Sequence, residues 1–268
     1  MLNWLLLWDL HWLHRLETWR RAHGQGARAW FEALAEFEAL SALATYRYEE
    51  PVAVFPQISD GPLHFTAEAL CHPLLDAPVA NDFQIQGPGE VWVITGSNMS
   101  GKTTLLRTVG LAVVMARAGA PVRAKTLRCS QPHVLTSMRI KDSLERGVSY
   151  FYAEVQRTKR LLDAAKAQPG QCLFLLDELM MGTNARERQI ASREVVRQLL
   201  LSGASGAITT HDLSLTEWTG DTRAHNVHFS DEVHNGQMHF DYQLKRGVVT
   251  TTNALKLLEA AGVPMPHS

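Results

Sequence analysis

The pattern of hydrophobic and polar residues differs between the first 48 residues and the rest of the chain, and this change marks a boundary. In the first part, large apolar side chains recur every three or four positions, as in Trp4, Trp8 and Trp12. That spacing places them on one face of a helix. Two glycines near residue 25 interrupt the pattern, which resumes over about residues 28–43. Residues 1–48 are therefore predicted to form a helical hairpin.

The apolar start of the chain does not predict a membrane span. A spanning helix needs about 20 apolar residues, whereas this run ends by residue 13 and contains Asp9 and His11. A secretory signal would need a basic start and a small-residue cleavage site, which are absent. We therefore expect no membrane partner. A helix on a lipid surface is one alternative, but the surface is better suited to packing on the following domain or on part of a longer protein.

Beyond residues 48–51 the pattern changes to short apolar runs that alternate with helical stretches. This alternation predicts an α/β domain over residues 49–268 with a mixed, largely parallel sheet. The dipeptide Asn235-Gly236 predicts a tight hairpin, because both residue types accept positive φ. Strands are predicted at residues 91–95, 173–176 and 207–210, hairpin strands at 229–233 and 238–242, and helices from about residues 102, 185 and 252.

The composition excludes a disordered or fibrous protein. Of the 268 residues, 46% are hydrophobic and 20% are charged, as in folded globular domains. The formal net charge of −1 provides no bulk attraction to nucleic acid or to an anionic membrane. Cys71, Cys129 and Cys172 form no C-x-x-C pair. They are predicted to be buried thiols in a reducing, cytoplasmic compartment rather than zinc ligands.

Four histidines near the predicted hairpin are of the residue type that zinc prefers. No cysteine lies nearby and the four positions straddle a turn, so polar surface is the simpler interpretation. The four are His225, His228, His234 and His239.

A glycine-rich segment between the strand at 91–95 and the following helix carries the main candidate chemistry. It satisfies the pattern G-x-x-x-x-G-K-[ST]. Backbone N–H groups and the helix N-terminus would attract a phosphate, Lys102 would neutralise β and γ oxygens, and the Thr103 hydroxyl could hold Mg²⁺. The predicted nucleotide-binding residues are Gly96, Ser97, Asn98, Met99, Ser100, Gly101, Lys102, Thr103 and Thr104.

Two carboxylates and a histidine follow later strands. Asp177 could reach the Mg²⁺ shell through water, and Glu178 could orient or deprotonate an attacking water. His211 follows the next strand and could hydrogen-bond that water or a γ-phosphate oxygen. Each of these residues alone is common as polar surface at a strand end. In this order behind a phosphate loop, they predict an ATPase whose site is completed by a second subunit.

The interval between the phosphate loop and the acidic strand separates two kinds of such ATPases. A transporter-type member would carry Leu-Ser-Gly-Gly-Gln there, and that sequence is absent. In its place Gly147-Val148-Ser149-Tyr150-Phe151 opens a predicted helix. The near match at residues 201–204 follows the acidic strand and is better explained as a helix end with a glycine stop.

Over roughly residues 50–264 the chain resembles the MutS family of mismatch-repair ATPases. The segment ITGSNMSGKTTLLRTVG is similar to the family's phosphate loop, with its unusual Asn-Met pair. LLDELMMGTNARER resembles the acidic strand, TTHDL the histidine switch, and CHPLL at 71–75 the His-Pro segment. NALKLLEAAGVP resembles the last helix of the family's domain. The resemblance implies a P-loop NTPase fold of the ABC-type ATPase class.

Residue by residue, the resemblance implies a site shared between two chains. Lys102 and Thr103 would bind ATP and Mg²⁺, Asp177 would support the metal, and His72 would lie beside the nucleotide. The catalytic residues implied are Glu178, His211 and, in trans from the partner of a homodimer, Ser149. Residues 123–166 carry ten Lys or Arg against four Asp or Glu. This excess favours approach to a polyanion, although a solvated basic face explains most of these side chains equally well.

The sequence also departs from the family pattern, and these departures limit what the resemblance implies. MutS proteins follow the Asp-Glu pair with Gly-Arg-Gly-Thr-Ser, whereas this chain has Leu179-Met180-Met181-Gly182-Thr183-Asn184, which indicates a divergent branch. Asn184 with Glu187 is predicted to cap the next helix. No segment resembles the mismatch-reading domain, and only residues 1–48 could be the end of a lever-type helical region. DNA binding and mismatch repair therefore rest on the resemblance alone.

Three functions remain open from the sequence. The first is an ATP-hydrolysing switch that dimerises around its nucleotide and moves a DNA-binding or partner-binding part. The second is a nucleotide-gated adaptor with little turnover. The third is another ABC-class ATPase subunit that acts on chromosomes.

Overall fold

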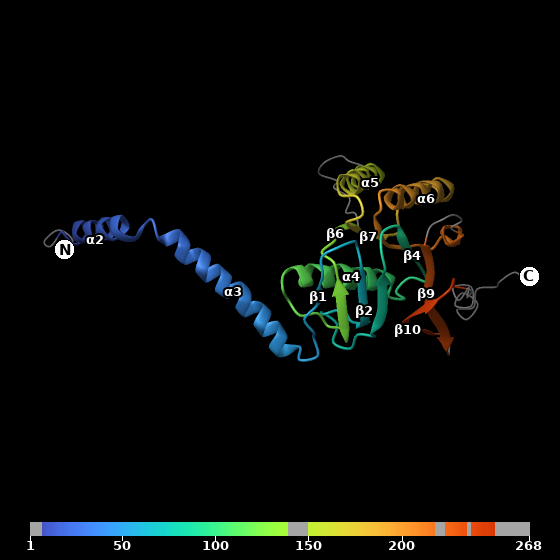
Figure 1. Cartoon of the computed structure of the whole chain (residues 1–268), viewed down its shortest axis with the longest axis horizontal. Coiled ribbons are helices and arrows are strands. Elements are labelled where there is room, and N and C mark those ends of the chain that lie inside the picture. Colours follow the sequence, from blue (N-terminus) through green and yellow to red (C-terminus); the bar gives the residue numbers. More distant parts are fainter. Residues whose placement is uncertain (1–6, 139–149, 218–222, 235–236, 250–268) are drawn as a thin grey trace, which may run out of the picture. The chain divides into compact units, whose positions relative to one another are not determined.

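The computed structural model describes residues 7–138, 150–217, 223–234 and 237–249 (Figure 1). The chain divides into two compact units, Met1–Pro51 and Val52–Ser268. Each unit is described by itself below.

The first unit contains two helices, α2 (Trp8–His23) and α3 (Ala27–Glu49). The two predicted helices are confirmed, but the hairpin is not. Gly24 and Gly26 both have right-handed helical dihedral angles, so the chain does not reverse there, and α3 leads away from α2 (Figure 1). Neither helix contains a buried residue. Their large apolar side chains, including Trp8, Trp12 and Phe31, are exposed.

The second unit is built on a six-stranded sheet with the order β10-β9-β4-β8-β7-β6. Every neighbouring pair in it is parallel except β9 and β10, which are antiparallel. The predicted mixed, largely parallel sheet is therefore confirmed. The strands are β4 (Glu90–Thr95), β6 (His133–Ser137), β7 (Cys172–Asp177), β8 (Ser205–Thr209), β9 (Arg223–His234) and β10 (Gln237–Arg246).

A second sheet, with the order β1-β5-β2-β3, was not predicted from the sequence as a separate layer. Its strands are short, and the strand at residues 126–129 pairs with two strands that lie more than 50 positions earlier in the chain. The strands are β1 (Gln57–Ile58), β2 (Phe65–Leu70), β3 (Asn81–Ile85) and β5 (Thr126–Cys129).

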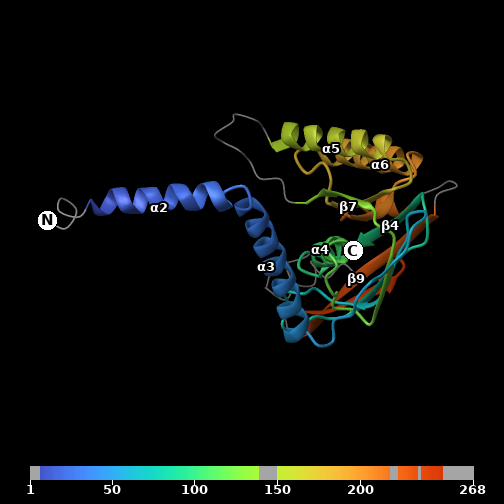
Figure 2. The same ribbon diagram turned by 60° about the vertical axis from the view of Figure 1, so that its left-hand side comes forward.

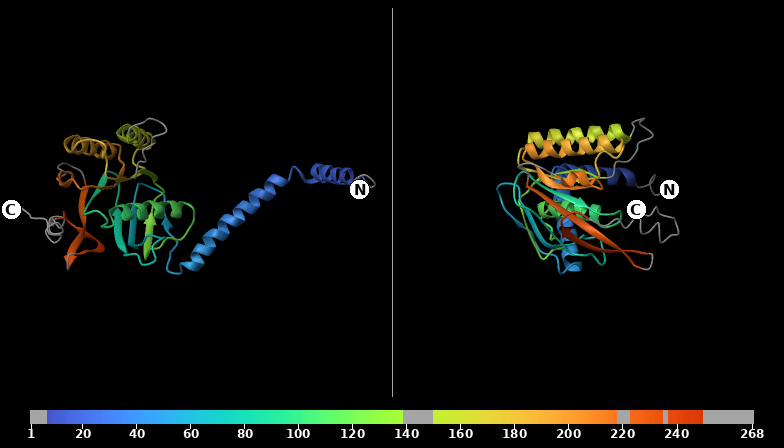
Figure 3. Two further views of the ribbon diagram at one scale, coloured as in Figure 1. Left: turned by 180° about the vertical axis from the view of Figure 1, so that it is seen from behind. Right: turned by 90° about the vertical axis from the view of Figure 1, so that its right-hand side faces the viewer.

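Helices cover both faces of the six-stranded sheet. Helix α4 (Lys102–Arg117) packs in a core that also holds residues of the second sheet. Helices α5 (Tyr150–Ala167) and α6 (Ala185–Leu201) lie side by side on the opposite face (Figures 2 and 3). A short 3₁₀ helix, η2 (Leu213–Thr216), follows β8.

Strand β4 alternates between these two cores, because successive side chains of a strand point to opposite faces. Val91 and Val93 pack on the side of α5 and α6, whereas Trp92 and Ile94 pack on the side of α4. The Trp92 ring lies 4.8 Å from the Phe83 ring, and its Nε1 donates a hydrogen bond to Glu90. β4 is therefore buried on both faces, as expected for a central parallel strand.

Several local predictions can be compared with the structure. The strand predicted at 207–210 is observed as β8, which begins two residues earlier and ends one residue earlier. Asn184 caps α6 by accepting a hydrogen bond from the Glu187 N–H at 3.0 Å. The predicted hairpin is confirmed as β9 and β10. Its Asn-Gly turn and the predicted last helix lie outside the described residues. No helix in the described part of the chain combines the length and apolar character needed to cross a membrane.

The three thiols differ in their surroundings. Cys129 and Cys172 are buried as predicted, and burial raises the pKa of Cys129 to about 11. Cys71 was also predicted to be buried, and that was wrong: it is only partly buried. It directly follows the end of β2, where the chain leaves the sheet.

Candidate functional site

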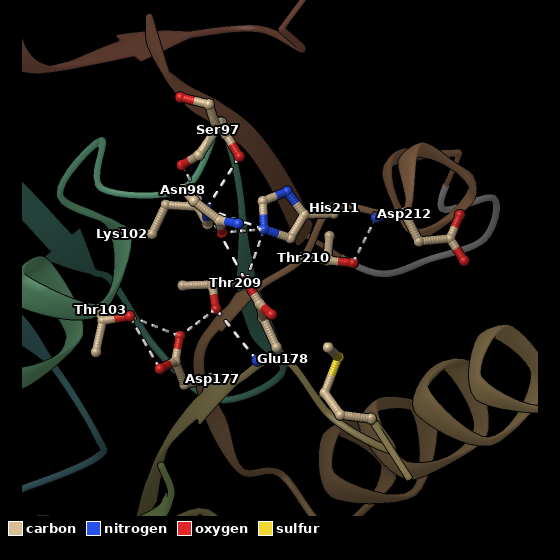
Figure 4. Close-up of polar contacts among 12 residues, drawn as sticks. Ser97, Asn98, Lys102, Thr103, Asp177, Glu178, Thr209, Thr210, His211 and Asp212 are labelled. Carbon is tan, nitrogen blue, oxygen red and sulfur yellow. Dashed lines mark hydrogen bonds and ion pairs between the residues drawn. The ribbon is translucent and has the colours of Figure 1, made fainter. Parts of the chain in front are cut away.

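The candidate residues meet at the carboxyl ends of three neighbouring parallel strands, β4, β7 and β8. In the register of the sheet, Thr209 pairs with Asp177 on one side and with Ile94 on the other. The glycine-rich loop follows β4, Asp177 is the last residue of β7, Glu178 comes directly after it, and the histidine follows β8 (Figure 4). Open parallel sheets place their ligand sites at this edge.

The loop between β4 and α4 requires backbone conformations that favour glycine. Gly96 has φ +144° and Gly101 has φ +110°. A Cβ at Gly96 would also lie 2.8 Å from the carbonyl oxygen of Phe229. These glycines let the loop close tightly against β9 before α4 begins. Met99, at the tip of the loop, has φ +66° and an exposed side chain.

Lys102 lies inside this loop and is 5% exposed. Its Nζ donates to the carbonyl oxygens of Gly96 at 2.9 Å and Ser97 at 2.8 Å. Burial lowers the pKa of Lys102, and the carboxylates of Glu178 and Asp177 oppose that shift. The ion pair from Lys102 Nζ to Glu178 Oε1 is long, at 4.0 Å. The site therefore holds a buried ammonium group without a close carboxylate partner among the contacts described.

Asp177 connects two hydroxyl groups from different elements. Thr103 Oγ1, at the start of α4, lies 2.9 Å from Asp177 Oδ2 and 3.1 Å from Oδ1. Thr209 Oγ1 donates to Asp177 Oδ1 at 2.6 Å and accepts the backbone N–H of Glu178 at 3.2 Å. These hydrogen bonds fix the acidic strand end to both α4 and β8.

Glu178 and His211 form the other half of the site. His211 Nε2 lies 2.8 Å from Glu178 Oε1 and 2.9 Å from Asn98 Oδ1. Because both partners are acceptors, Nε2 carries a proton. Lys102 Nζ lies 3.4 Å from the same nitrogen, and since both groups are then donors this is a contact rather than a hydrogen bond.

The surroundings of Glu178 favour its ionised form. The hydrogen bond from His211 is the largest influence and lowers the pKa of Glu178. Partial burial opposes this shift, while the charges of Lys102 and Arg188 support it. Glu178 itself has φ +48°, an uncommon backbone conformation for a residue with a side chain.

Two cavities adjoin these residues. One of about 550 Å³ lies beside the phosphate loop and α4, and His72 lines it together with Asn81, Thr104 and Tyr242. Burial, followed by the charge of Arg107, lowers the pKa of His72, so its Nδ1 can accept the Leu74 N–H at 3.2 Å. The other cavity, of about 170 Å³, is lined by residues that include Glu178, His211 and Arg188.

Comparison with known protein families shows to which family the chain belongs. The family model described as MutS domain V matches residues 92–267, more than half of the chain. The chain belongs to the MutS family.

Individual proteins of that family are also similar to this chain in sequence. The chain is 31% identical over 201 residues to "Endonuclease MutS2" of Thermus thermophilus, covering 72% of this chain and 26% of the relative. It is 30% identical over 264 residues to "Endonuclease MutS2" of Streptococcus thermophilus, covering 94% and 32%. It is 31% identical over 245 residues to "DNA mismatch repair protein MutS" of Natronomonas pharaonis, covering 87% and 27%. The chain thus spans about a third or less of the length of these relatives.

The MutS-type residues proposed from the sequence do not all lie within the described part of the chain. The phosphate loop, Asp177, Glu178 and His211 come together as described above, and His72 lies across the larger cavity. Ser149 lies outside the described residues. Two of the four histidines near the hairpin have other partners: His225 Nε2 lies 3.1 Å from Glu90 Oε1, and His228 Nδ1 lies 3.1 Å from the Gly247 carbonyl oxygen.

Sequence reasoning assigned no role to three contributors to this MutS-family site. Thr209 was part of a quoted motif but had no assigned role, and Tyr242 lies in a strand with no signal of function. Asn81 Nδ2 donates to the Tyr242 carbonyl oxygen at 2.9 Å, and Asn81 Oδ1 accepts the Leu244 N–H at 2.7 Å. Asn81 thus joins β3 to β10 beside the larger cavity, across more than 150 positions of sequence.

Proposed function

We propose that this chain contains a P-loop ATPase domain of the ABC type, which binds Mg²⁺-ATP at the edge formed by β4, β7 and β8 and hydrolyses it. The observation that carries the proposal is the buried Lys102 ammonium, held by loop carbonyl oxygens within reach of Asp177, Glu178 and His211. A buried charge without a close counter-ion is costly. A polyphosphate in the loop would supply that counter-ion.

The triphosphate would lie against the loop and the N-terminus of α4. Backbone N–H groups of the loop and the helix dipole favour an anion there. The neighbouring 550 Å³ cavity is large enough for the nucleoside. His72 and Tyr242 line its walls, so the base would lie between the phosphate loop and the second sheet.

The oxygen atoms of Thr103 and Asp177 fit Mg²⁺, which prefers hard oxygen ligands and retains several of its waters. Thr103 donates its single hydroxyl proton to Asp177, so the lone pairs of Thr103 Oγ1 remain available to a cation. Thr103 would hold the metal directly and Asp177 would hold it through water. The metal would supply charge neutralisation at the β- and γ-phosphates.

Glu178 would act on the attacking water. Its lowered pKa keeps the carboxylate ionised near neutral pH, so it can accept a hydrogen bond from water and orient it. His211 Nε2 donates to Glu178 in the geometry described above. The same N–H would be able to stabilise negative charge on the γ-phosphate if the nucleotide displaced one of its two acceptors.

A second copy of the chain would complete the site. Residues 49–268 would form the ATPase domain, and residues 1–48 would be the end of a lever-type helical region. Ser149 would reach the γ-phosphate held by the partner, so hydrolysis would require a homodimer. Coupling of this switch to DNA and to mismatch repair is supported by family membership and by the names of the relatives.

The proposal is tested by measuring Mg²⁺-ATP binding and ATP turnover per chain over a range of protein concentrations. Turnover per chain should rise with concentration and be lost in Ser149→Ala, which retains the nucleotide-binding loop. Lys102→Ala should weaken nucleotide binding. Absence of binding at millimolar Mg²⁺-ATP would contradict the ATPase assignment, and concentration-independent turnover would contradict the shared site.

A further inference from the structure

Glu154 is a buried carboxylate that the proposed reaction does not use. It lies near the start of α5 and is 1% exposed. Its Oε1 accepts the backbone N–H of Met180 at 2.5 Å. Its Oε2 has no hydrogen-bond partner within the described part of the chain. A carboxylate in such a place is costly unless the interaction it makes is needed.

The Met180 N–H belongs to an unusual turn directly after Glu178. Glu178 and Met180 both have positive φ, +48° and +59°, although neither is glycine. Leu179, which lies between them, and Met180 itself are buried in the core formed with α5 and α6. A residue in this conformation persists only where its surroundings hold it, and a buried N–H needs an acceptor.

Contacts from three elements hold this turn. From β8, Thr209 accepts the Glu178 N–H. From α6, Ser192 Oγ donates to the Leu179 carbonyl oxygen at 3.3 Å. From α5, Glu154 accepts the Met180 N–H, and it is the only one of the three partners with a charged side chain.

We propose that Glu154 is a positioning residue for Glu178: its carboxylate fixes the turn at residues 178–180 so that the Glu178 side chain faces His211. This inference rests on the proposed ATPase function. Releasing the Met180 N–H would let the turn relax toward negative φ and would rotate the Glu178 side chain away from the site. Nucleotide binding by the loop and Lys102 would be left intact, because Glu154 makes no described contact with either.

The test compares three substitutions of Glu154. Glu154→Leu removes the acceptor at similar volume, Glu154→Asp retains the charge but withdraws the carboxylate by one methylene, and Glu154→Gln retains one acceptor oxygen. We expect kcat to fall about tenfold or more in the Leu and Asp variants, with little change in the Kd for Mg²⁺-ATP, since small misplacement of a catalytic group is costly. The Gln variant should recover most of the lost turnover.

Thr158→Val is the matched control. Thr158 lies one helical turn further along α5, is also buried, and its Oγ1 has no partner among the described residues. It should retain wild-type kcat. If Thr158→Val loses as much turnover as Glu154→Leu, the effect comes from disturbance of α5 and the positioning role is wrong.

A double-mutant cycle with Glu178→Gln separates positioning from a general structural role. If Glu154 acts through Glu178, Glu154→Leu should lower kcat little further in the Glu178→Gln background. An equal loss in both backgrounds, or unchanged kcat in both Glu154→Leu and Glu154→Asp, would overturn the inference.

Amide hydrogen exchange provides a readout that does not depend on turnover. Exchange at residues 179–181 should be faster in Glu154→Leu and Glu154→Asp than in wild type or Thr158→Val. If the wild-type protein binds but does not hydrolyse ATP, the proposed function fails by itself. Unchanged exchange at Met180 would then still overturn the role of Glu154, so the two failures are distinguishable.

Discussion

At the scale of single residues, the proposed chemistry depends most on Glu178, which occupies a backbone conformation that glutamate rarely adopts. Substituting Glu178→Gln preserves the shape of the side chain but removes its capacity to act as a base. We expect Mg²⁺-ATP binding to remain and kcat to fall by at least about 10²-fold, as for removal of a positioned general base. Glu194→Gln, on the exposed side of α6, is the control. Wild-type turnover by Glu178→Gln would contradict the assigned role.

The pKa of Glu178 gives a second prediction at this scale. His211 is the main cause of its lowered pKa, so the ionised form stabilises the folded protein above the ordinary glutamate pKa of 4.5. That contribution disappears as pH falls through the lowered value in the folded state. Removing the donor with His211→Ala should raise the pKa of Glu178 and shift the acidic limb of the kcat–pH profile to higher pH.

The matched variant is His211→Gln, which keeps an N–H donor. Its acidic limb should stay closer to that of the wild type when ATP turnover is measured from about pH 4 to 7. Identical limbs in the wild type and in His211→Ala would show that His211 does not control the ionisation of Glu178.

Residue spacing explains why part of this site could be anticipated. Lys102, Thr103, Asp177 and Glu178 follow predicted strands, and strand ends of a parallel sheet gather at one edge. The contact of Asn98 with His211 spans 113 positions of sequence. It depends on the fold of two loops, for which the hydrophobic pattern contains no information.

At the scale of elements, β7 and β8 approach each other so closely at Gly206 that a side chain there would not fit. Gly206 pairs with Phe174, and a Cβ at Gly206 would lie 1.9 Å from the Phe174 carbonyl oxygen. Gly206→Ala must therefore separate the two strands, three residues from the pairing of Asp177 with Thr209. We expect a loss of about 3 kcal/mol in the free energy of unfolding.

Urea unfolding measures this loss. Gly87→Ala is the control, because a Cβ there would meet only the flexible end of the Arg223 side chain at 3.4 Å. A change in Gly206→Ala no larger than in Gly87→Ala would show that the sheet tolerates the extra atom.

The order of the elements was harder to predict than their existence. The helices at residues 102 and 185 and the hairpin at the end of the sheet followed from periodicity and from capping and turn residues. The position of β4 between β8 and β9, and the second sheet on the far side of α4, depend on contacts between distant segments. The burial of Glu154 was equally hidden, since a glutamate in an amphipathic helix is expected on the polar face.

At the scale of the whole molecule, both hydrophobic cores consist of residues from the second unit. The helices of the first unit contain no buried residue. A chain of residues 52–268 should therefore fold alone, with an unfolding midpoint within about 2 °C of the full chain, because removing exposed residues changes stability little. Thermal unfolding followed by circular dichroism measures this. A fall of about 10 °C or more would show that the first unit contributes to the core.

The placement of the tryptophans also gives the molecule an optical property. Five of its seven tryptophans lie within residues 1–51, and those that the structure describes there are exposed. Trp92 is buried in β4, four residues before the phosphate loop. In the shorter chain the five tryptophans of residues 1–51 would be gone, and only Trp92 and Trp218 would emit. A quenching experiment on that chain with Trp218→Phe would then report on the strand that leads into the nucleotide loop, with no added dye.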